Sequence, residues 1–187
     1  MKATALIRKQ HRNIDALLRT LARGGTLDDL RRLADVLAAH ALMEEESVYP
    51  VVRERREDVI LKALESHAVA RHELERLMRG LPGEPAFHAR ARTLRALVKQ
   101  HAGEEEAVLL PRLEKALQRQ EQTALGTLLE KRFQELVAVG HDEVLARLAT
   151  LDAEEEPIEL EPLEDDDDED GELLIEHAPP EWRASQA

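Results

Sequence analysis

Apolar residues recur at three- and four-residue intervals along most of residues 3–151, a period that predicts amphipathic helices. Four of these stretches are long, and short segments rich in glycine, proline or charge separate them. The expected helices run from about 3 to 23, 26 to 50, 58 to 79 and 85 to 117. Short turns between long helices place successive helices antiparallel, so the pattern predicts an all-α, up-down four-helix bundle.

Boundary signals support these helices. Gly24-Gly25 follows the first stretch, and Thr26 with Asp29 three residues later has the spacing of a capping box. Pro85 suits the first turn of the fourth helix. A further amphipathic segment covers 125–136, and Gly140 is expected to separate it from a shorter helix over 144–151.

Composition agrees with an all-α protein, since Ala, Leu, Glu and Arg dominate and aromatic residues make up only 2%. The chain has no cysteine, which excludes disulfides, thiolate metal sites and thiol nucleophiles. No stretch approaches the roughly 20 apolar residues of a membrane span, and the N-terminus lacks a signal-peptide core. Membrane association is therefore not expected, and a cytoplasmic location is.

Charge divides the chain into two parts. Residues 152–187 hold 16 of the 39 acidic residues and one of the 26 basic ones, so they carry −15 and the remainder +2. Basic residues of that remainder alternate with acidic ones, which argues against a nucleic-acid surface. We therefore expect three regions: a bundle over 1–118, an additional helical segment packing on it over 119–151, and an acidic, disordered tail over 152–187.

The tail also contains a short apolar segment at 173–175, followed by two prolines and the only tryptophan, Trp182. An apolar patch behind an acidic spacer suggests a docking peptide for a protein partner. Folding back onto the protein's own bundle is the alternative.

The four predicted helices form two helical hairpins that share the same sequence pattern. The second and fourth helices share the motif H-A-x-x-E-E-x-x-x-x-P, which begins at His40 and again at His101. The first and third helices share a histidine, His11 or His67, followed at equal offsets by two leucines, an arginine and a glycine. Each hairpin therefore has a histidine on its first helix and a His/Glu pair on its second.

The shared residues lie in the apolar stripes that the helices must bury. A single His-x-x-x-Glu pair is weak evidence, since the chain has three and chance would give about one. Burial of a carboxylate or an unpaired imidazole is costly, however, and all four helices place such residues inward at similar levels. The set predicts one shared metal site, with a purely structural polar core as the alternative. The candidate ligands are His11, His40, Glu44, His67, His101 and Glu105.

The donor types narrow the choice of metal. Four imidazoles and two carboxylates exceed the needs of one zinc ion, and calcium or magnesium would prefer oxygen donors throughout. Imidazole with carboxylate suits iron, and two ions bridged by both carboxylates would use every ligand. Copper, manganese and zinc stay possible from ligand type alone.

With these motifs in their order, residues 1–118 resemble the hemerythrin-like, HHE cation-binding domains. The resemblance implies a di-iron centre in which two carboxylates and an oxo or hydroxo group bridge the irons. It also implies that an open iron position binds dioxygen. Members of that family further serve in oxygen or iron sensing, nitric oxide or peroxide handling and iron storage.

The sequence departs from the oxygen carriers of that family on the third helix. They have a histidine four residues after the position of His67, where this chain has Arg71. His72 is rotated by about 140° from His67 and would need a local bulge to reach the metals, so an exposed position is preferred for it. The unpartnered His88 and His141 are also expected at the surface. With one ligand fewer, an iron should keep an exchangeable water, which favours nitric oxide or peroxide chemistry. Arg71 could hold an anionic ligand or pair with Glu45, and Tyr49 could approach the site from one turn away. Ordinary packing or surface roles are preferred for both.

The resulting hypothesis is a di-iron protein that binds or reacts with dioxygen, nitric oxide or peroxide. The alternative is an iron sensor or reservoir whose metal-dependent fold is relayed to a partner through the tail. Peroxide decomposition would make the protein an enzyme, although no general-base or nucleophile motif accompanies the ligands. The sequence predicts no oligomeric state.

Overall fold

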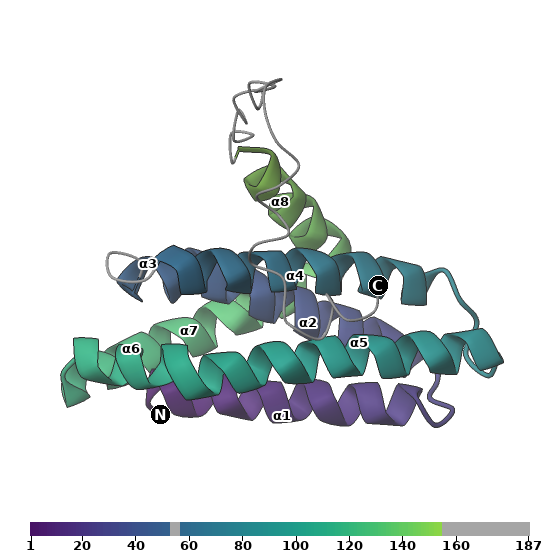
Figure 1. Ribbon diagram of the computed structural model, residues 1–187, viewed down its shortest axis with the longest axis horizontal. Helices are drawn as coiled ribbons and strands as arrows, with labels where there is room; N and C mark the ends of the chain where they lie inside the picture. The colour runs from purple at the N-terminus through teal and green to yellow at the C-terminus, as the bar shows by residue number, and fades with distance from the viewer. Residues whose placement is uncertain (53–56, 155–187) are drawn as a thin grey trace, which may run out of the picture. The chain divides into compact units, whose positions relative to one another are not determined.

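The computed structural model describes residues 1–52 and 57–154, which contain helices and no strand. Four long helices, α1 (Ala3–Leu21), α2 (Leu27–Ser47), α4 (Glu57–Met78) and α5 (Pro85–Glu104), lie alongside one another (Figure 1). Helix α1 contacts α2 and α5, and α4 contacts the same two helices, so the four close into a bundle. The prediction of an up-down four-helix bundle is confirmed, and the predictions for the tail concern residues 155–187, which lie outside the described residues.

Two further helices follow the bundle where additional helical segments were predicted. Helix α7 (Arg119–Val139) packs against α1 and α2, and α8 (His141–Glu154) packs against α2. Gly140 separates them with a φ of 93°, a left-handed conformation that glycine adopts without strain. Figure 1 shows α8 leaving at a steep angle to the long helices. The division of the chain at 118 and 151 stays a prediction.

The start of α2 forms as its sequence indicates. The Thr26 side chain accepts a hydrogen bond from the backbone N–H of Asp29, and the Asp29 carboxylate accepts one from the backbone N–H of Thr26. This reciprocal capping box is worth about 1 kcal/mol and confirms the predicted boundary.

The fourth predicted helix is interrupted, which corrects the expectation of one helix over 85–117. After α5, residues Glu105–Leu109 form a π-helical segment, and α6 (Leu110–Ala116) resumes the α-helix. Pro111 explains the interruption, because proline has no N–H to donate and its ring would clash with the carbonyl four residues earlier. Within the segment the backbone N–H of Leu110 bonds to the oxygen of Glu105, five residues back. The extra residue reorients the chain at Glu105, a candidate ligand.

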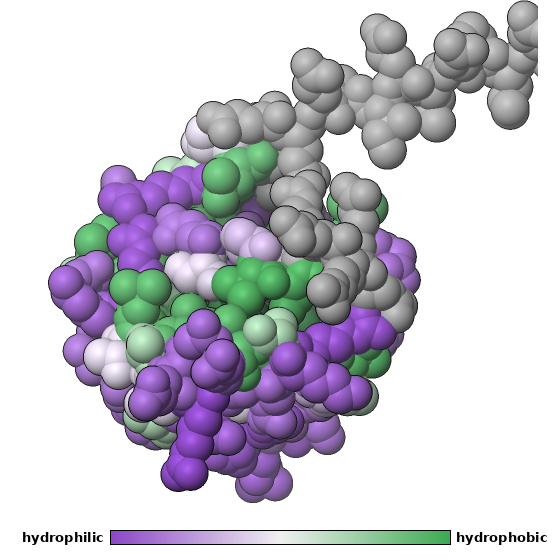
Figure 2. Space-filling model, turned by 90° about the vertical axis from the view of Figure 1, so that its left-hand side faces the viewer, coloured by the Kyte–Doolittle hydropathy of each residue, from purple (hydrophilic) through white to green (hydrophobic). Residues whose placement is uncertain are grey.

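The equivalent proline of the first hairpin ends its helix instead. Helix α2 stops at Ser47, and the short α3 (Tyr49–Val52) contains Pro50. The two copies of the motif therefore diverge in structure after their glutamates. At this end of the molecule, apolar side chains gather within a hydrophilic surround (Figure 2).

Two apolar clusters fill the interior of residues 1–154. One contains Ile7, Leu42 and Met43, and the other contains Ile14 and Leu37. On α1, α4 and α5 the candidate ligands lie between the two clusters in sequence, as His11 does between Ile7 and Ile14, whereas on α2 they lie among residues of the first cluster. Apolar packing on both sides thus holds the polar centre in place.

Helix α7 approaches the start of α1 so closely that only glycine fits at position 126. A Cβ atom there would lie 2.1 Å from the backbone oxygen of Met1 and 2.8 Å from the nitrogen of Ala3. We therefore expect Gly126→Ala to lower the free energy of unfolding by about 1 to 3 kcal/mol in urea titrations. Gly103, which is helical and has no atom within 4 Å of its Cβ position, is the matched control. There the same substitution should stabilise the protein by about 0.5 to 1 kcal/mol, and equal effects at both positions would contradict the close approach.

Candidate metal centre

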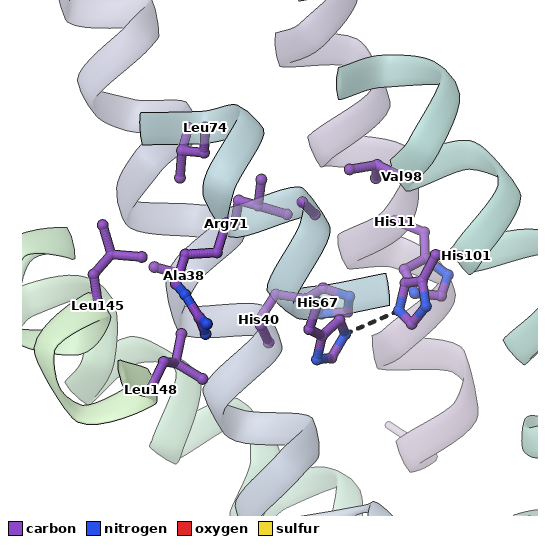
Figure 3. Close-up of a pocket in the computed structure, with 13 residues that line it drawn as sticks. His11, Ala38, His40, His67, Arg71, Leu74, Val98, His101, Leu145 and Leu148 are labelled. Atoms are coloured by element: carbon purple, nitrogen blue, oxygen red, sulfur yellow. Dashed lines mark hydrogen bonds between the residues drawn. The ribbon is translucent and has the colours of Figure 1, made fainter. Parts of the chain in front are cut away.

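All six predicted ligands lie at the centre of the bundle. Each side chain comes from the position where its helix crosses the core, and none of the six residues is more than 8% exposed. Figure 3 shows the four imidazoles turned toward one another from four different helices. The structure thus brings together His11, His40, Glu44, His67, His101 and Glu105.

Their donor atoms form two overlapping groups in which every atom lies within 4.8 Å of the others. The larger group has four donors, from His11, His40, Glu44 and Glu105. The smaller has three, from Glu44, His67 and His101. Glu44 belongs to both groups, as expected of a carboxylate placed between two ions.

The two carboxylates each face imidazoles from two helices. Glu44 Oε2 lies 3.3 Å from His40 Nε2 and 3.6 Å from His67 Nε2. Glu105 Oε2 lies 3.2 Å from His11 Nε2 and 3.5 Å from His101 Nε2. Each glutamate therefore links the histidine of its own hydrophobic stripe to the histidine of a neighbouring helix.

Several of these buried atoms lack hydrogen bonds of acceptable geometry. Among the described residues, Nε2 of His11 and His40, both oxygens of Glu44 and Oε2 of Glu105 have no such partner. Some lie within ion-pair distance of one another, but their lone pairs and protons are not aligned to bond. Leaving a buried polar atom unsatisfied costs about 1 to 3 kcal/mol, so this concentration of atoms fits a cation held between them.

A second layer of polar residues orients the imidazoles. His11 Nδ1 lies 2.9 Å from Glu106 Oε1, and His67 Nδ1 lies 2.8 Å from Glu45 Oε1. His40 Nδ1 is 3.0 Å from Gln10 Oε1. With Nδ1–H donating outward, Nε2 faces the centre, which is the arrangement that a metal-binding histidine needs.

Glu45 and Glu106 were not predicted to act at the site, although the repeated motif contained the signal. In both copies a second glutamate follows the ligand glutamate directly, at equivalent positions of the two hairpins. Each contacts the histidine of the other hairpin's first helix. The double glutamate therefore serves two tasks, the first toward the centre and the second toward a neighbouring imidazole.

We expect Glu45→Gln to weaken metal binding about 10- to 100-fold, because His67 loses the carboxylate that orients its ring. Competition with a coloured chelator measures the affinity. Glu46→Gln is the matched control, since Glu46 lies one residue further along α2 and pairs at the surface with Arg132. Equal affinities of the two variants would contradict the orienting role of Glu45.

Without a bound metal, the four histidines of the centre differ in pKa and therefore in charge. Burial disfavours the protonated form of His11, but the close contact with Glu105 and the charges of the nearby carboxylates raise its pKa to about 9. For His67, Glu44 and Glu45 overcome burial in the same way and raise the pKa to about 10. Burial and the neighbouring cationic imidazoles lower the pKa of His40 and of His101, the latter to about 4. At neutral pH two of the four histidines thus carry the positive charge.

These pKa values predict that metal binding releases about two protons from His11 and His67 at pH 7.5, since a bound imidazole must be deprotonated. A raised histidine pKa stabilises the metal-free fold fully below about 6.5, and this contribution is lost as pH rises through 9 and 10. Metal affinity should therefore rise with pH between 6.5 and 9. Calorimetry in two buffers of different ionisation enthalpy counts the protons, and a count of zero would contradict the charge assignment.

Tyr49 lies inside the centre, so the preference for a packing or surface role was wrong. Its side chain is buried, and its hydroxyl donates to Glu105 Oε1 at 2.9 Å and lies 3.2 Å from His67 Nε2. Burial and the neighbouring carboxylates raise its pKa well above the usual value. Its position nine residues after His40 held no recognisable signal, because the other motif copy has leucine there.

The remaining histidines lie outside the centre. His72 is exposed, as predicted. His88 and His141 are half-buried and have partners, which corrects the expectation of unpartnered surface residues. His88 Nδ1 lies 3.2 Å from the backbone oxygen of Leu21, and His141 Nδ1 lies 2.6 Å from Asp35 Oδ1. The latter contact holds the start of α8 against α2.

A small cavity of about 30 Å³ adjoins the centre. Figure 3 shows His40, His67 and Arg71 on one side, with Leu145 and Leu148 of α8 opposite them. Apart from the histidines and Arg71, its lining is aliphatic. The cavity has room for a molecule of two or three atoms.

The chain is similar to proteins of known family and structure. A family model described as the hemerythrin HHE cation binding domain matches residues 2–113, which include all six candidate ligands. The crystal structure of a hemerythrin HHE cation binding domain-containing protein from Mycobacterium kansasii superposes with a TM-score of 0.68 at 19% identity, covering 79% of this chain and 99% of that chain. Identity at this level shows a shared fold. No curated protein matches the sequence.

Proposed function

The chain belongs to the hemerythrin HHE cation binding domain family, and on that premise we propose that it holds two iron ions and binds or reacts with a small oxidant. The proposed ligands are His11, His40, Glu44, His67, His101 and Glu105. The proposed oxidants are dioxygen, nitric oxide and peroxide. None of the described helices is long and apolar enough to cross a membrane.

One observation supports this proposal most strongly: five of the buried side-chain atoms without hydrogen bonds belong to His11, His40, Glu44 and Glu105, which lie together in the two donor groups. Four nitrogen and four carboxylate oxygen atoms suit iron, and the sharing of Glu44 suits a pair of ions. Bound iron would supply redox chemistry and open coordination positions. The chain's residues hold the imidazoles in orientation, neutralise charge and exclude bulk water through the apolar clusters on either side.

The direct test is the iron content of purified, fully loaded protein, followed by addition of oxidant to the reduced form. We expect about two irons per chain. A reversible charge-transfer band would indicate binding, and continuous loss of peroxide would indicate an enzyme. Folded, fully loaded protein with less than one iron per chain would contradict the di-iron proposal.

A second candidate, an iron sensor or reservoir, is favoured by the cost of the metal-free centre. Buried ionisable groups without partners make the fold sensitive to metal occupancy. Gross unfolding on iron removal would support this candidate over a ligand-binding role. Relay through the acidic tail concerns residues outside the described part of the chain.

The cavity beside the centre predicts that α8 limits the entry of small ligands to the metal centre. Leu148 lines it and is 2% exposed, so Leu148→Ala should widen the path and speed azide binding to the ferric protein several-fold. Stopped-flow absorbance measures the rate. Leu151, 39% exposed on the same helix, is the matched control and should leave the rate unchanged when replaced by alanine. Unaltered azide kinetics in Leu148→Ala would mean that small ligands enter elsewhere.

A further inference from the structure

The two donor groups of the centre are unequal. One offers four protein donors, and the other offers only Glu44, His67 and His101. The repeated hairpins account for most of the symmetry, so the difference is expected at positions where the two copies of the motif hold different residues. Arg71, one turn after His67 on α4, lines the cavity beside the centre and provides no donor atom suited to a cation.

Tyr49 lies beside the smaller group. Its hydroxyl oxygen is 3.2 Å from His67 Nε2, its ring stacks on that of His67 at 5.6 Å, and the residue is 2% exposed. It begins α3, directly after the break in α2 that Pro50 causes. The equivalent residue of the other hairpin is Leu110, which is fully buried and apolar. A hydroxyl therefore lies beside His67, and the equivalent position of the other hairpin offers no oxygen donor.

We infer that Tyr49 is a further protein ligand of this centre, binding through its phenolate oxygen to the ion held by Glu44, His67 and His101. The inference rests on the proposed function, since it concerns the same pair of ions. It raises the smaller group to four protein donors, equal to the larger.

Distances around the hydroxyl support ligation. Two donors bound at right angles to one ion, each at about 2.1 Å, lie about 3 Å apart. Within the smaller group, His67 Nε2 lies 2.9 Å from His101 Nε2 and 3.2 Å from Tyr49 Oη. Because Glu45 occupies His67 Nδ1, Nε2 is the atom that faces the ion. The hydroxyl therefore lies next to a metal-facing atom at the spacing of neighbouring ligands.

The hydrogen bond of the Tyr49 hydroxyl to Glu105 does not account for the position of this hydroxyl beside His67. In the metal-free protein the hydroxyl donates to Glu105 Oε1, an oxygen that the centre would also use. A cation between these atoms would replace this hydrogen bond, and the phenolic proton would leave to solvent. Phenolate is a hard anionic donor that favours ferric over ferrous iron. The ligand should therefore lower the reduction potential and oppose reversible dioxygen carriage.

The experiment uses full-length, iron-loaded, oxidised protein and resonance Raman spectroscopy in its visible absorption band. Tyr49 is the only tyrosine of the chain, so phenolate ring modes can be assigned without mutagenesis. We expect these modes in the wild type and their loss in Tyr49→Phe. A ferric protein with two irons per chain and no phenolate modes would overturn the inference and leave the proposed function intact.

Variants separate ligation from packing. Tyr49→Phe keeps the ring, so helical circular dichroism should persist while the iron is held more weakly and its reduction potential rises. Tyr49→His restores a donor and should recover iron retention without phenolate modes. Leu110→Met, at the equivalent position of the other hairpin, should leave spectrum and iron content unchanged. Wild-type and Tyr49→Phe proteins with the same visible spectrum and potential would also overturn the inference.

Discussion

Replacing Glu44 by glutamine is expected to remove nearly all bound iron. Glu44 is the one residue present in both donor groups, and it faces His40 and His67 from the middle of α2. Glutamine keeps the shape but loses the charge and one acceptor oxygen, so both ions lose a ligand together. Iron per chain, measured after loading and desalting, should fall from about two toward zero.

Three consecutive glutamates make this test unusually well controlled. Glu44 faces the centre, Glu45 contacts His67 from outside it, and Glu46 pairs with Arg132 at the surface. Glutamine substitutions should therefore give loss, weakening and no change, in that order. If Glu44→Gln retained two irons per chain, the bridging role of Glu44 would be wrong.

The second expected result concerns stability without metal. Glu44 is fully buried, and burial together with the charge of Glu105 raises its pKa to about 7. Replacing such a group by an apolar side chain of similar size removes a desolvation cost. Because its pKa is raised even though imidazoles face it, the ionised Glu44 side chain costs stability at pH 7, and we expect Glu44→Met to raise the free energy of unfolding of the metal-free protein by about 1 to 3 kcal/mol. Urea unfolding at pH 7 with a chelator present measures it.

This result distinguishes a metal site from a structural polar core. If mutual hydrogen bonds were the purpose of these residues, Glu44→Met would lower stability by several kcal/mol. Leu42→Met, at another fully buried position of α2, is the packing control and should cost less than about 1.5 kcal/mol. A gain in stability with a loss of iron would show that the carboxylate is kept for binding.

Local periodicity allowed much of the molecule to be predicted. The helices, the capping box at Thr26 and the turn at Gly140 depend on residues close together in sequence. The six candidate ligands could also be found, because polar residues in buried stripes are costly and their repetition is not accidental. Their arrangement in the structure agrees with that prediction, while their binding of iron awaits the experiments above.

Other features depend on contacts between helices distant in sequence. Glu45 and Glu106 each contact a histidine of the other hairpin, and periodicity within one helix does not specify such a pair. Prolines at equivalent motif positions gave a helix end at Pro50 and a π-helical segment before Pro111. The missing proline N–H has different consequences because α2 ends and is followed by the short α3, whereas α5 continues into α6.

The sequence by itself therefore determined which residues of each helix face inward, since burying an amphipathic helix leaves one choice of face. Only the tertiary structure decided what surrounds the inward polar residues. It placed the hydroxyl of Tyr49 beside His67, and it placed Leu145 and Leu148 of α8 against the cavity. These placements depend on how helices pack and where they break, which is a property of the whole fold.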